Sequence, residues 1–368
     1  MHIEHLAVFH FRNLDKLALD LTPRAVVLRG RNAQGKTNLL EAVYVCTTGR
    51  SFRNAAPREL LRHGAEKGWI KSRFQRQGVR HDVETHLTST QRSIRVDGRS
   101  LRQASRLLEL VNVVAFFPDD LRIVKGSPEE RRRFLDRAVA NYRPEMVDAA
   151  TAYAKALRSR NALLRAESPP SADMLAAYDD QLVHHGEVIH RCRCEGLAAL
   201  APLAAARFAA MMPDVPPLAL RLESGVPGDD DALFDGSFGE RLREALAKSY
   251  PRDRARGATS VGAHRADLVI TLDVHSARAF ASQGQQRAMV VALKLAELQC
   301  LTEQLDSPPI LLLDDVSSEL DAERTRLLFS ELEKTSSQVW VSTTGAVELP
   351  LPGDAQIFEV DDGRINAV

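Results

Sequence analysis

Cysteine, aromatic residues and long hydrophobic runs are all scarce in this sequence. Its 368 residues hold only four cysteines, namely Cys46, Cys192, Cys194 and Cys300. Four are too few for a disulfide scaffold in a chain of this length, so they favour a reducing compartment. Aromatic residues make up 5% of the chain, and this low share argues against a surface built mainly from stacking platforms.

The sequence also lacks the patterns that direct or anchor a protein to a membrane. The N-terminus carries polar residues such as His2, Glu4 and His5 where a secretory signal has its apolar core. No run approaches 18 apolar residues, the length that marks a membrane-spanning helix. We therefore expect a cytoplasmic protein with no membrane partner.

A metal site formed by the cysteines is a minor alternative. Cys192 and Cys194 are close in sequence, but no second pair lies nearby and the flanking residues are typical of a helix. Structural zinc sites need four ligands at characteristic spacings. The spacing therefore gives little support to zinc.

Charge is balanced overall but not along the chain. The net charge is zero, yet 14 Lys and Arg face only 5 Asp and Glu between Arg50 and Arg106. The remainder carries the opposite excess, part of it at Asp229, Asp230 and Asp231. This asymmetry permits a phosphate-binding face on one lobe, although solvated strand and loop positions would explain the same residues.

The two ends of the chain have the pattern of strands and helices in alternation. Residues 25–28 are a short apolar run, typical of a strand buried on both faces, and helical spacing follows from Leu39. Residues 69–97 predict further strands, with a turn at Asp97 and Gly98. Buried strands are predicted again at residues 310–313 and 339–341.

The middle of the chain is predicted to be helical. Ser127, Pro128 and Glu130 form a capping signal for a helix that ends before Pro144. Further helices are expected over residues 145–167 and from Ala172 toward Met212, joined by a proline turn, so they should pack as an antiparallel hairpin. Residues 213–239 are rich in Pro, Gly and Asp, strand-like alternation resumes at residues 268–272, and another helix is predicted over residues 285–301.

One loop carries the strongest chemical signal. It fits the phosphate-binding pattern G-x-x-x-x-G-K-[ST] and consists of Gly30, Arg31, Asn32, Ala33, Gln34, Gly35, Lys36 and Thr37. Its glycines let backbone N–H groups turn toward phosphate oxygens, and the helix that follows adds positive potential. Lys36 is expected to reach the β- and γ-phosphates of ATP, while Thr37 offers a hydroxyl ligand to Mg²⁺.

Paired carboxylates follow another predicted buried strand. Asp314 is expected to hold Mg²⁺ through water, and Asp315 to polarise the water that attacks the γ-phosphate. Asp314 lies 278 positions after Lys36, a separation that points to an SMC-like head with a large helical insertion. The alternative is a strand that ends in a solvated acidic turn.

A second helix start lies about thirty residues before the acidic strand. Ser282 and Gln285 form a capping pair, and Gly284 allows close approach to the N–H groups there. ABC ATPases carry their signature at this position, where it contacts the γ-phosphate bound by the opposite subunit. Residues 318–321 resemble the D-loop of that class. A plain helix cap is the simpler reading of Ser282.

Several strings resemble the bacterial RecF family along nearly the whole chain. They include Phe11-Arg12-Asn13, the phosphate loop continued through Asn38 to Ala42, Gly49-Arg50-Ser51-Phe52-Arg53, Phe117-Pro118-Asp119-Asp120-Leu121, Arg160-Asn161-Ala162-Leu163-Leu164, Gly262-Ala263-His264-Arg265 and residues 282–287.

This resemblance implies an α/β ABC/SMC-type P-loop ATPase head built from both termini, with an inserted helical lobe containing a short hairpin. The head would span residues 1–122 and 296–368, and the helical lobe residues 123–295. ATP would drive dimerisation on DNA at single-strand/double-strand junctions. RecR and RecO would be partners in loading RecA during gap repair and fork restart.

The resemblance also implies a weak, DNA-stimulated ATPase that times release. Thr343 and Thr344 stand where ABC ATPases place a histidine, which is in keeping with slow hydrolysis. Gln75 and Gln77 are candidates for the Q-loop by distance only. For DNA phosphates the candidate contacts are Arg50, Arg53, Arg58 and Arg62, and residues 131–133 form a weaker set.

Two other functions stay open. The ATP subunit of a membrane transporter would need a Leu-Ser-Gly-Gly-Gln signature and would leave the helical insertion unexplained. An SMC-like nuclease would need a metal-binding cluster, for which His184, His185 and His190 are the only dense histidines. On a helix these histidines are expected to be surface residues.

Overall fold

The computed structural model describes residues 1–21, 24–103, 105–228, 236–305, 307–315, 322–334, 337–344 and 355–368. The predicted D-loop at residues 318–321 and the acidic residues at 229–231 lie outside these ranges. The chain divides into two compact units. The first unit contains residues 1–120 and 297–368, and the second unit contains residues 121–296.

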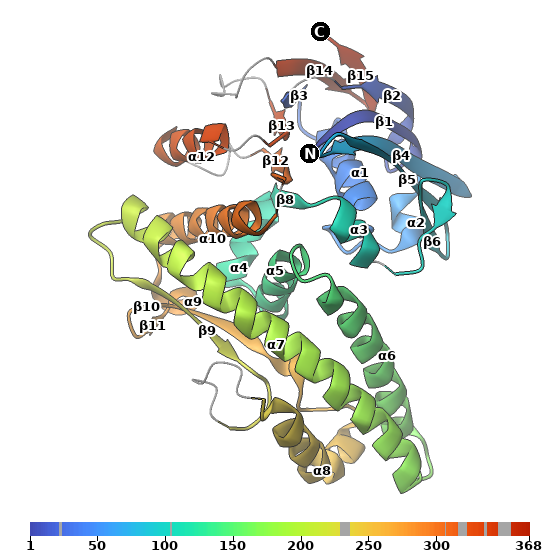
Figure 1. The fold of residues 1–368 in the computed structure, drawn as a ribbon, viewed down its shortest axis with the longest axis vertical. Coiled ribbons are helices and arrows are strands. Elements are labelled where there is room, and N and C mark those ends of the chain that lie inside the picture. Colours follow the sequence, from blue (N-terminus) through green and yellow to red (C-terminus); the bar gives the residue numbers. More distant parts are fainter. Residues whose placement is uncertain are drawn as a thin grey trace. The chain divides into compact units, whose positions relative to one another are not determined.

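A mainly parallel six-stranded sheet joins both ends of the chain in the first unit (Figure 1). Its order is β15 (Arg364–Ala367), β14 (Ala355–Asp361), β3 (Ala25–Arg29), β13 (Val339–Thr343), β12 (Ile310–Asp314) and β8 (Val113–Phe116). Every residue of β12 and β13 is buried, as strands covered on both faces require. The three buried strands expected from the sequence are therefore confirmed.

An antiparallel sheet forms the other layer of the first unit. Its strands, in spatial order, are β2 (Leu14–Asp20), β1 (His2–Phe11), β4 (Lys67–Arg76), β5 (Val79–Thr88), β6 (Arg92–Val96) and β7 (Arg99–Ser100). Alternate residues of β4, such as Ile70 and Phe74, are buried, and α1 (Lys36–Thr48) contacts β1, β4 and β5. Hydrophobic residues therefore face the core on one side while the other side stays polar. Short helices α2 (Pro57–Leu60) and α3 (Ser105–Leu110) complete this unit before β8.

The second unit is largely helical, and the helices predicted from Ser127, over residues 145–167 and from Ala172 toward Met212 are confirmed. They are α5 (Pro128–Ala140), α6 (Glu145–Arg165) and α7 (Ala172–Met211). At the start of α5 the Glu130 carboxylate accepts a hydrogen bond from the Ser127 N–H at 2.7 Å, as the capping signal indicates. Helices α6 and α7 lie side by side as the expected hairpin (Figure 1).

Two elements of the second unit were not predicted. Strand β9 (Leu218–Glu223) lies within the Pro-, Gly- and Asp-rich stretch, and helix α8 (Phe238–Arg256) follows it. Strand β9 pairs with β10 (Asp267–Leu272), which pairs in turn with β11 (His275–Ser276). Pro251 inside α8 hides its helical pattern.

The remaining elements are α4 (Arg122–Lys125), α9 (Ala277–Phe280), α10 (Gln283–Gln304), which continues into the first unit, and α12 (Ala322–Lys334) of the first unit.

Helix α7 is long and apolar enough to cross a membrane by length and composition alone, although no membrane span is expected from the sequence. It contains an 18-residue window of mean hydropathy 1.3, of which 28% is buried. In the structure α7 contacts α5, α6, α8 and β9, and its Arg193 is held by Asp136 at 2.7 Å. Such contacts are those of a helix inside a folded domain, which makes the composition weak support for a membrane span.

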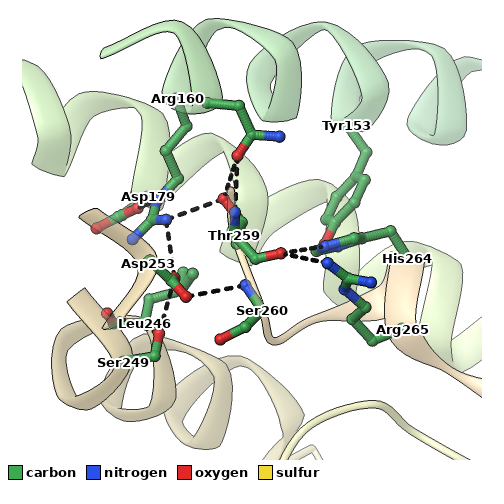
Figure 2. Close-up of polar contacts among 11 residues, drawn as sticks. Tyr153, Arg160, Asp179, Leu246, Ser249, Asp253, Thr259, Ser260, His264 and Arg265 are labelled. Atoms are coloured by element: carbon green, nitrogen blue, oxygen red, sulfur yellow. Dashed lines mark hydrogen bonds and ion pairs between the residues drawn. The ribbon is translucent and has the colours of Figure 1, made fainter. Parts of the chain in front are cut away.

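Buried charges tie the helical hairpin to the segment after α8 (Figure 2). The fully buried Arg160 of α6 donates to Asp179 of α7 at 2.6 Å, to Asp253 of α8 at 3.2 Å and to Thr259 at 2.9 Å. Asp253 is also fully buried. Each charge offsets the desolvation of the other, so removing Arg160 would leave Asp253 as an uncompensated buried ion.

A neutral histidine extends this network. Burial lowers the pKa of His264 to about 4. Its Nε2 lies 3.1 Å from the Thr259 carbonyl, which can only accept, so Nε2 carries the proton. Its Nδ1 therefore accepts from the Tyr153 hydroxyl at 2.9 Å (Figure 2). The strings around Arg160 and His264 thus meet in one polar cluster of the second unit.

Replacing Arg160 by leucine is expected to destabilise the second unit by about 3–5 kcal/mol, because Asp253 would be left as an unpaired buried charge. The thermal unfolding midpoint should fall by roughly 5 °C or more. Arg158→Leu is the matched control, since Arg158 is exposed on the same helix. Equal midpoints for the two variants would contradict the role assigned to Arg160.

Candidate nucleotide site

The phosphate-binding loop connects the buried strand β3 to the helix α1. Gly35 precedes the first turn of α1, and no side chain caps the N–H groups there. Gly35 has a φ of 115°, and a Cβ at this position would lie 2.8 Å from the side-chain amide of Asn13. Only glycine fits both constraints. The open helix N-terminus is suited to an anion.

Lys36 points back into this loop. Its Nζ donates to the carbonyl of Gly30 at 2.6 Å and to that of Arg31 at 2.9 Å. Burial lowers the pKa of the Lys36 ammonium, while Asp315 and Asp314 act in the opposite direction. The loop thus holds a cation at its centre, and both carboxylates lie within electrostatic range of it.

The carboxylate pair meets the loop at the carboxyl end of β12. Asp314 Oδ1 accepts from Thr37 Oγ1 at 3.0 Å and from Ser342 Oγ at 2.6 Å, and Ser342 Oγ accepts from the Asp315 N–H at 2.9 Å. Burial raises the pKa of Asp314, against the lowering effect of the bonds from Ser342 and Thr37. The predicted Mg²⁺ ligands, far apart in sequence, therefore lie side by side. Ser342 was not predicted.

A buried glutamate organises the rim of the loop. Glu41 of α1 is fully buried and accepts from Arg12 at 2.9 Å through both oxygens, from Ser51 at 2.5 Å and from Arg53 at 3.2 Å. Arg53 also donates to Asn38 Oδ1 at 2.9 Å. Its charge lowers the pKa of the nearby Asp314. Arg53, a candidate DNA contact, therefore sits beside the nucleotide loop.

The turn between β14 and β15 forms hydrogen bonds to the phosphate-binding loop. Gln34 accepts through its side chain from the Asp362 N–H at 2.7 Å and through its carbonyl from the Gly363 N–H at 2.8 Å. Asn13 donates to the same carbonyl at 3.1 Å. The amide of Gln34 is thus engaged with the turn between β14 and β15. Of the other loop residues, Asn32 and Ala33 are exposed.

The signature candidate belongs to the second unit. Ser282 Oγ accepts from the Gln285 N–H at 3.3 Å, and Gln285 Oε1 accepts from the Ser282 N–H at 2.8 Å. This reciprocal pair caps the start of α10. Ser282 and Gln283 are exposed and Gly284 is partly exposed. The helix tip is therefore formed and accessible.

The candidate DNA arginines fall into different environments. Arg50 and Arg58 are exposed, whereas Arg62 pairs with Asp15. Arg131, from the weaker set, is 8% exposed and forms two 2.7 Å bonds to Asp267. Its role is therefore structural.

Two further expectations concern glutamine and histidine. Gln75 lies in β4 and Gln77 in the turn that follows it. His184 is exposed, but the expectation that all three histidines are on the surface was wrong for His190. It is 8% exposed and stacks on Phe238 with ring centroids 4.2 Å apart. The described residues contain no group of three or more possible metal ligands.

Comparison with known proteins is consistent with this geometry. Residues 2–349 match the family described as the RecF/RecN/SMC N terminal domain. The DNA replication and repair protein RecF of Anaeromyxobacter sp. (strain Fw109-5) is 41% identical over 368 residues, covering 100% of this chain and 99% of the relative. RecF of Myxococcus xanthus (strain DK1622) is 41% identical over 345 residues, covering 94% and 91%.

Solved structures give the same result. A structure of the recombination mediator protein RecF-ATPrS in the RecFOR pathway has a TM-score of 0.89 and 29% identity, covering 100% of this chain and 98% of that one. An Smc head bound to the C-winged helix domain of ScpA has a TM-score of 0.55 at 15% identity, which concerns the fold alone.

The fold and the loop define an ABC/SMC-type P-loop ATPase head. Within that class, the chain belongs to the RecF family of DNA replication and repair proteins.

The raised pKa of Asp314 predicts a pH-dependent effect of removing its charge. A buried carboxyl group with a raised pKa binds its proton more tightly in the folded state, so wild-type stability falls as pH rises through that range. Asp314→Asn can still accept from Thr37 and Ser342 but carries no charge. Without nucleotide, its thermal midpoint should exceed that of the wild type at pH 8, and the gap should close toward pH 4.

The exposed Asp361 at the end of β14 supplies the control. Asp361→Asn should show no such pH-dependent gap. A midpoint of Asp314→Asn that lies below wild type at every pH would contradict the account of Asp314.

Proposed function

We propose that this chain binds ATP and Mg²⁺ at the phosphate-binding loop. The observation that carries the proposal is the hydrogen bond between Thr37 and Asp314, which places two oxygen ligands together beside Lys36. Lys36 would contact the β- and γ-phosphates, and the remaining residues of 30–38 would supply backbone N–H groups. Solved RecF structures similar to this chain are described with ATP and ATPrS, which supports the same ligand here.

Hydrolysis would use the second carboxylate. Asp315 would polarise the attacking water, while Asp314 holds the Mg²⁺ that neutralises charge on the phosphates. Thr343 is buried at the end of β13, next to Ser342, whose hydroxyl donates to the Asp314 carboxylate and accepts from the Asp315 backbone N–H. A threonine hydroxyl at this position cannot carry a proton as the imidazole of a histidine does. We therefore expect slow ATP hydrolysis that times release from DNA.

The second half of the site would come from another copy of the chain. Ser282, Gly284 and Gln285 form an accessible, capped helix tip with N–H groups suited to a phosphate. In the proposed dimer, this tip closes over the ATP bound by Lys36 of the partner. ATP thereby becomes part of the interface, and association depends on it. We propose that residues 1–122 and 296–368 act as the ATPase lobe and residues 123–295 as the helical lobe.

The dimer would act on DNA in recombinational gap repair. RecF relatives are named as DNA replication and repair proteins, and the solved RecF structures are described in the RecFOR pathway. We therefore propose binding at single-strand/double-strand junctions, cooperation with RecR and RecO in loading RecA, and a cytoplasmic location. The exposed Arg50 and Arg58 are the favoured phosphate contacts, while Arg53 serves the nucleotide site instead.

The ATP-dependent dimer is tested by sedimentation of the purified chain with ATP and Mg²⁺. Wild type should shift from monomer to dimer. Lys36→Met should stay monomeric because it loses the nucleotide, whereas Ser282→Arg should stay monomeric while still binding ATP. Ser330→Arg, an exposed serine on α12, is the control and should dimerise. A wild type that stays monomeric at saturating ATP would refute the dimer.

The arginine contacts are tested by the salt dependence of DNA affinity. Each phosphate contact contributes about 0.9 to the slope of log affinity against log salt. Arg50→Gln with Arg58→Gln should therefore reduce the slope for gapped DNA by up to about 2. Arg158→Gln is the control on α6. An unchanged slope would remove Arg50 and Arg58 from the interface.

A further inference from the structure

The open face of the antiparallel sheet carries a row of ring side chains. Phe9 of β1 pairs with Lys16 of β2 on one side and with Trp69 of β4 on the other, and Trp69 pairs with His86 of β5. Residues in register across neighbouring strands point to the same face of a sheet. One row therefore presents a lysine, two aromatic rings and an imidazole across four strands.

These side chains lie on the side of the sheet away from α1. The neighbours of Trp69 in β4, Gly68 and Ile70, are buried in the core, whereas Trp69 itself is partly exposed. Phe9 is likewise partly exposed between the buried Val8 and the partly exposed His10. Aromatic residues are few in this chain, and the core is where they are most easily accommodated. Their position on the polar face therefore needs an explanation.

The rings form a stacked row in which His10 covers a face of Phe9 and Phe9 lies beside Trp69. The ring centroids of Phe9 and Trp69 are 5.7 Å apart with planes at 23°, and His10 stacks on Phe9 at 3.7 Å. The Lys71 ammonium lies 5.4 Å from the Trp69 ring. A cation beside the face of an indole ring is favourable.

Cations flank this surface on several strands. Lys16, Lys67 and Arg95 are exposed on the same face, and no carboxylate partner is recorded for them among the described residues. Two other cations are already paired, since Lys71 donates to Glu84 at 2.9 Å and Arg73 to Asp82 at 2.9 Å. The face thus keeps a net positive charge around the rings.

We propose that this face binds single-stranded DNA, with a base stacked on Trp69 and phosphates held by Lys16 and Lys67. This inference rests on the proposed function and names the surface that receives the unpaired strand of a junction. Aromatic rings on an open sheet, flanked by cations, are the recurring means of holding single strands without sequence preference. In duplex DNA both faces of each base are covered by neighbours, so the rings select the unpaired strand.

A cross-strand aromatic pair that only stabilises the sheet is the competing explanation. That explanation predicts no response of the rings to DNA. The chain allows a direct test, since it has two tryptophans, of which Trp340 is fully buried in β13. Quenching of tryptophan emission therefore reports on Trp69.

The experiment titrates the full chain, with ATP and Mg²⁺, with (dT)15, with a blunt duplex and with a gapped duplex. Trp340→Phe leaves Trp69 as the only tryptophan, and in this variant (dT)15 and gapped DNA should quench emission while the blunt duplex does not. Labelled DNA followed by anisotropy gives affinities of the other variants. Trp69→Leu should weaken (dT)15 binding by about tenfold to a hundredfold, the range for one stacked base, and change duplex affinity by less than about twofold.

Two controls separate stacking from folding and from general charge. Trp69→Phe keeps a ring and should retain most of the affinity for (dT)15. Lys16→Gln with Lys67→Gln should weaken (dT)15 binding, whereas Lys248→Gln with Lys334→Gln, exposed lysines on α8 and α12, should not.

The inference is overturned if (dT)15 binds without quenching, if it does not bind while gapped or blunt duplex does, or if Trp69→Leu binds (dT)15 as wild type does. Those results leave the proposed function in place. Absence of binding to every DNA with and without ATP overturns the proposed function and this inference together.

Discussion

The structure of the site depends on one partly buried hydrogen bond, from Thr37 at the start of α1 to Asp314 at the end of β12. It joins two residues 277 positions apart and brings the phosphate loop to the carboxylates. Asp314 stays in this position because Ser342 on the adjacent strand also donates to it. The charged form of the Asp314 carboxyl group is therefore destabilised by burial, as its raised pKa indicates. A divalent cation would relieve that burial, which links the stability of the empty site to its proposed chemistry.

Around this bond, several further hydrogen bonds fix the conformation of the phosphate-binding loop. Glu41 gathers Arg12, Ser51 and Arg53 on one side. The turn at Asp362 and Gly363 holds Gln34 on the other. A preorganised phosphate site costs little reorganisation when the ligand arrives. Segments near both chain termini contribute, so the shape of the loop depends on contacts between residues far apart in sequence.

The sequence was sufficient for those parts of the site that are local. The glycines of the loop, the capping pair at Ser282 and the buried strand before Asp314 each follow from neighbours within a few residues. Ser342, and the proximity of Arg53 to Asp314, depend on which strands and loops lie together, and no local pattern contains that information. For the same reason His190 was expected on the surface, although a ring nearly fifty positions later covers it. Strand β9 and helix α8 were missed because turn-forming residues and an internal proline obscured them. Composition alone also argued against aromatic platforms, whereas strand register places Phe9 beside Trp69.

The central claim is that Thr37 and Asp314 form a metal-assisted triphosphate site together with Lys36. Calorimetric titration of ATP into the purified chain, with Mg²⁺ and then with a chelator in its place, tests this claim most directly. The account predicts one ATP per chain, with affinity that falls sharply without Mg²⁺ and with Asp314→Asn. Equal ATP affinity with and without the metal, or no heat of binding in either condition, would contradict it.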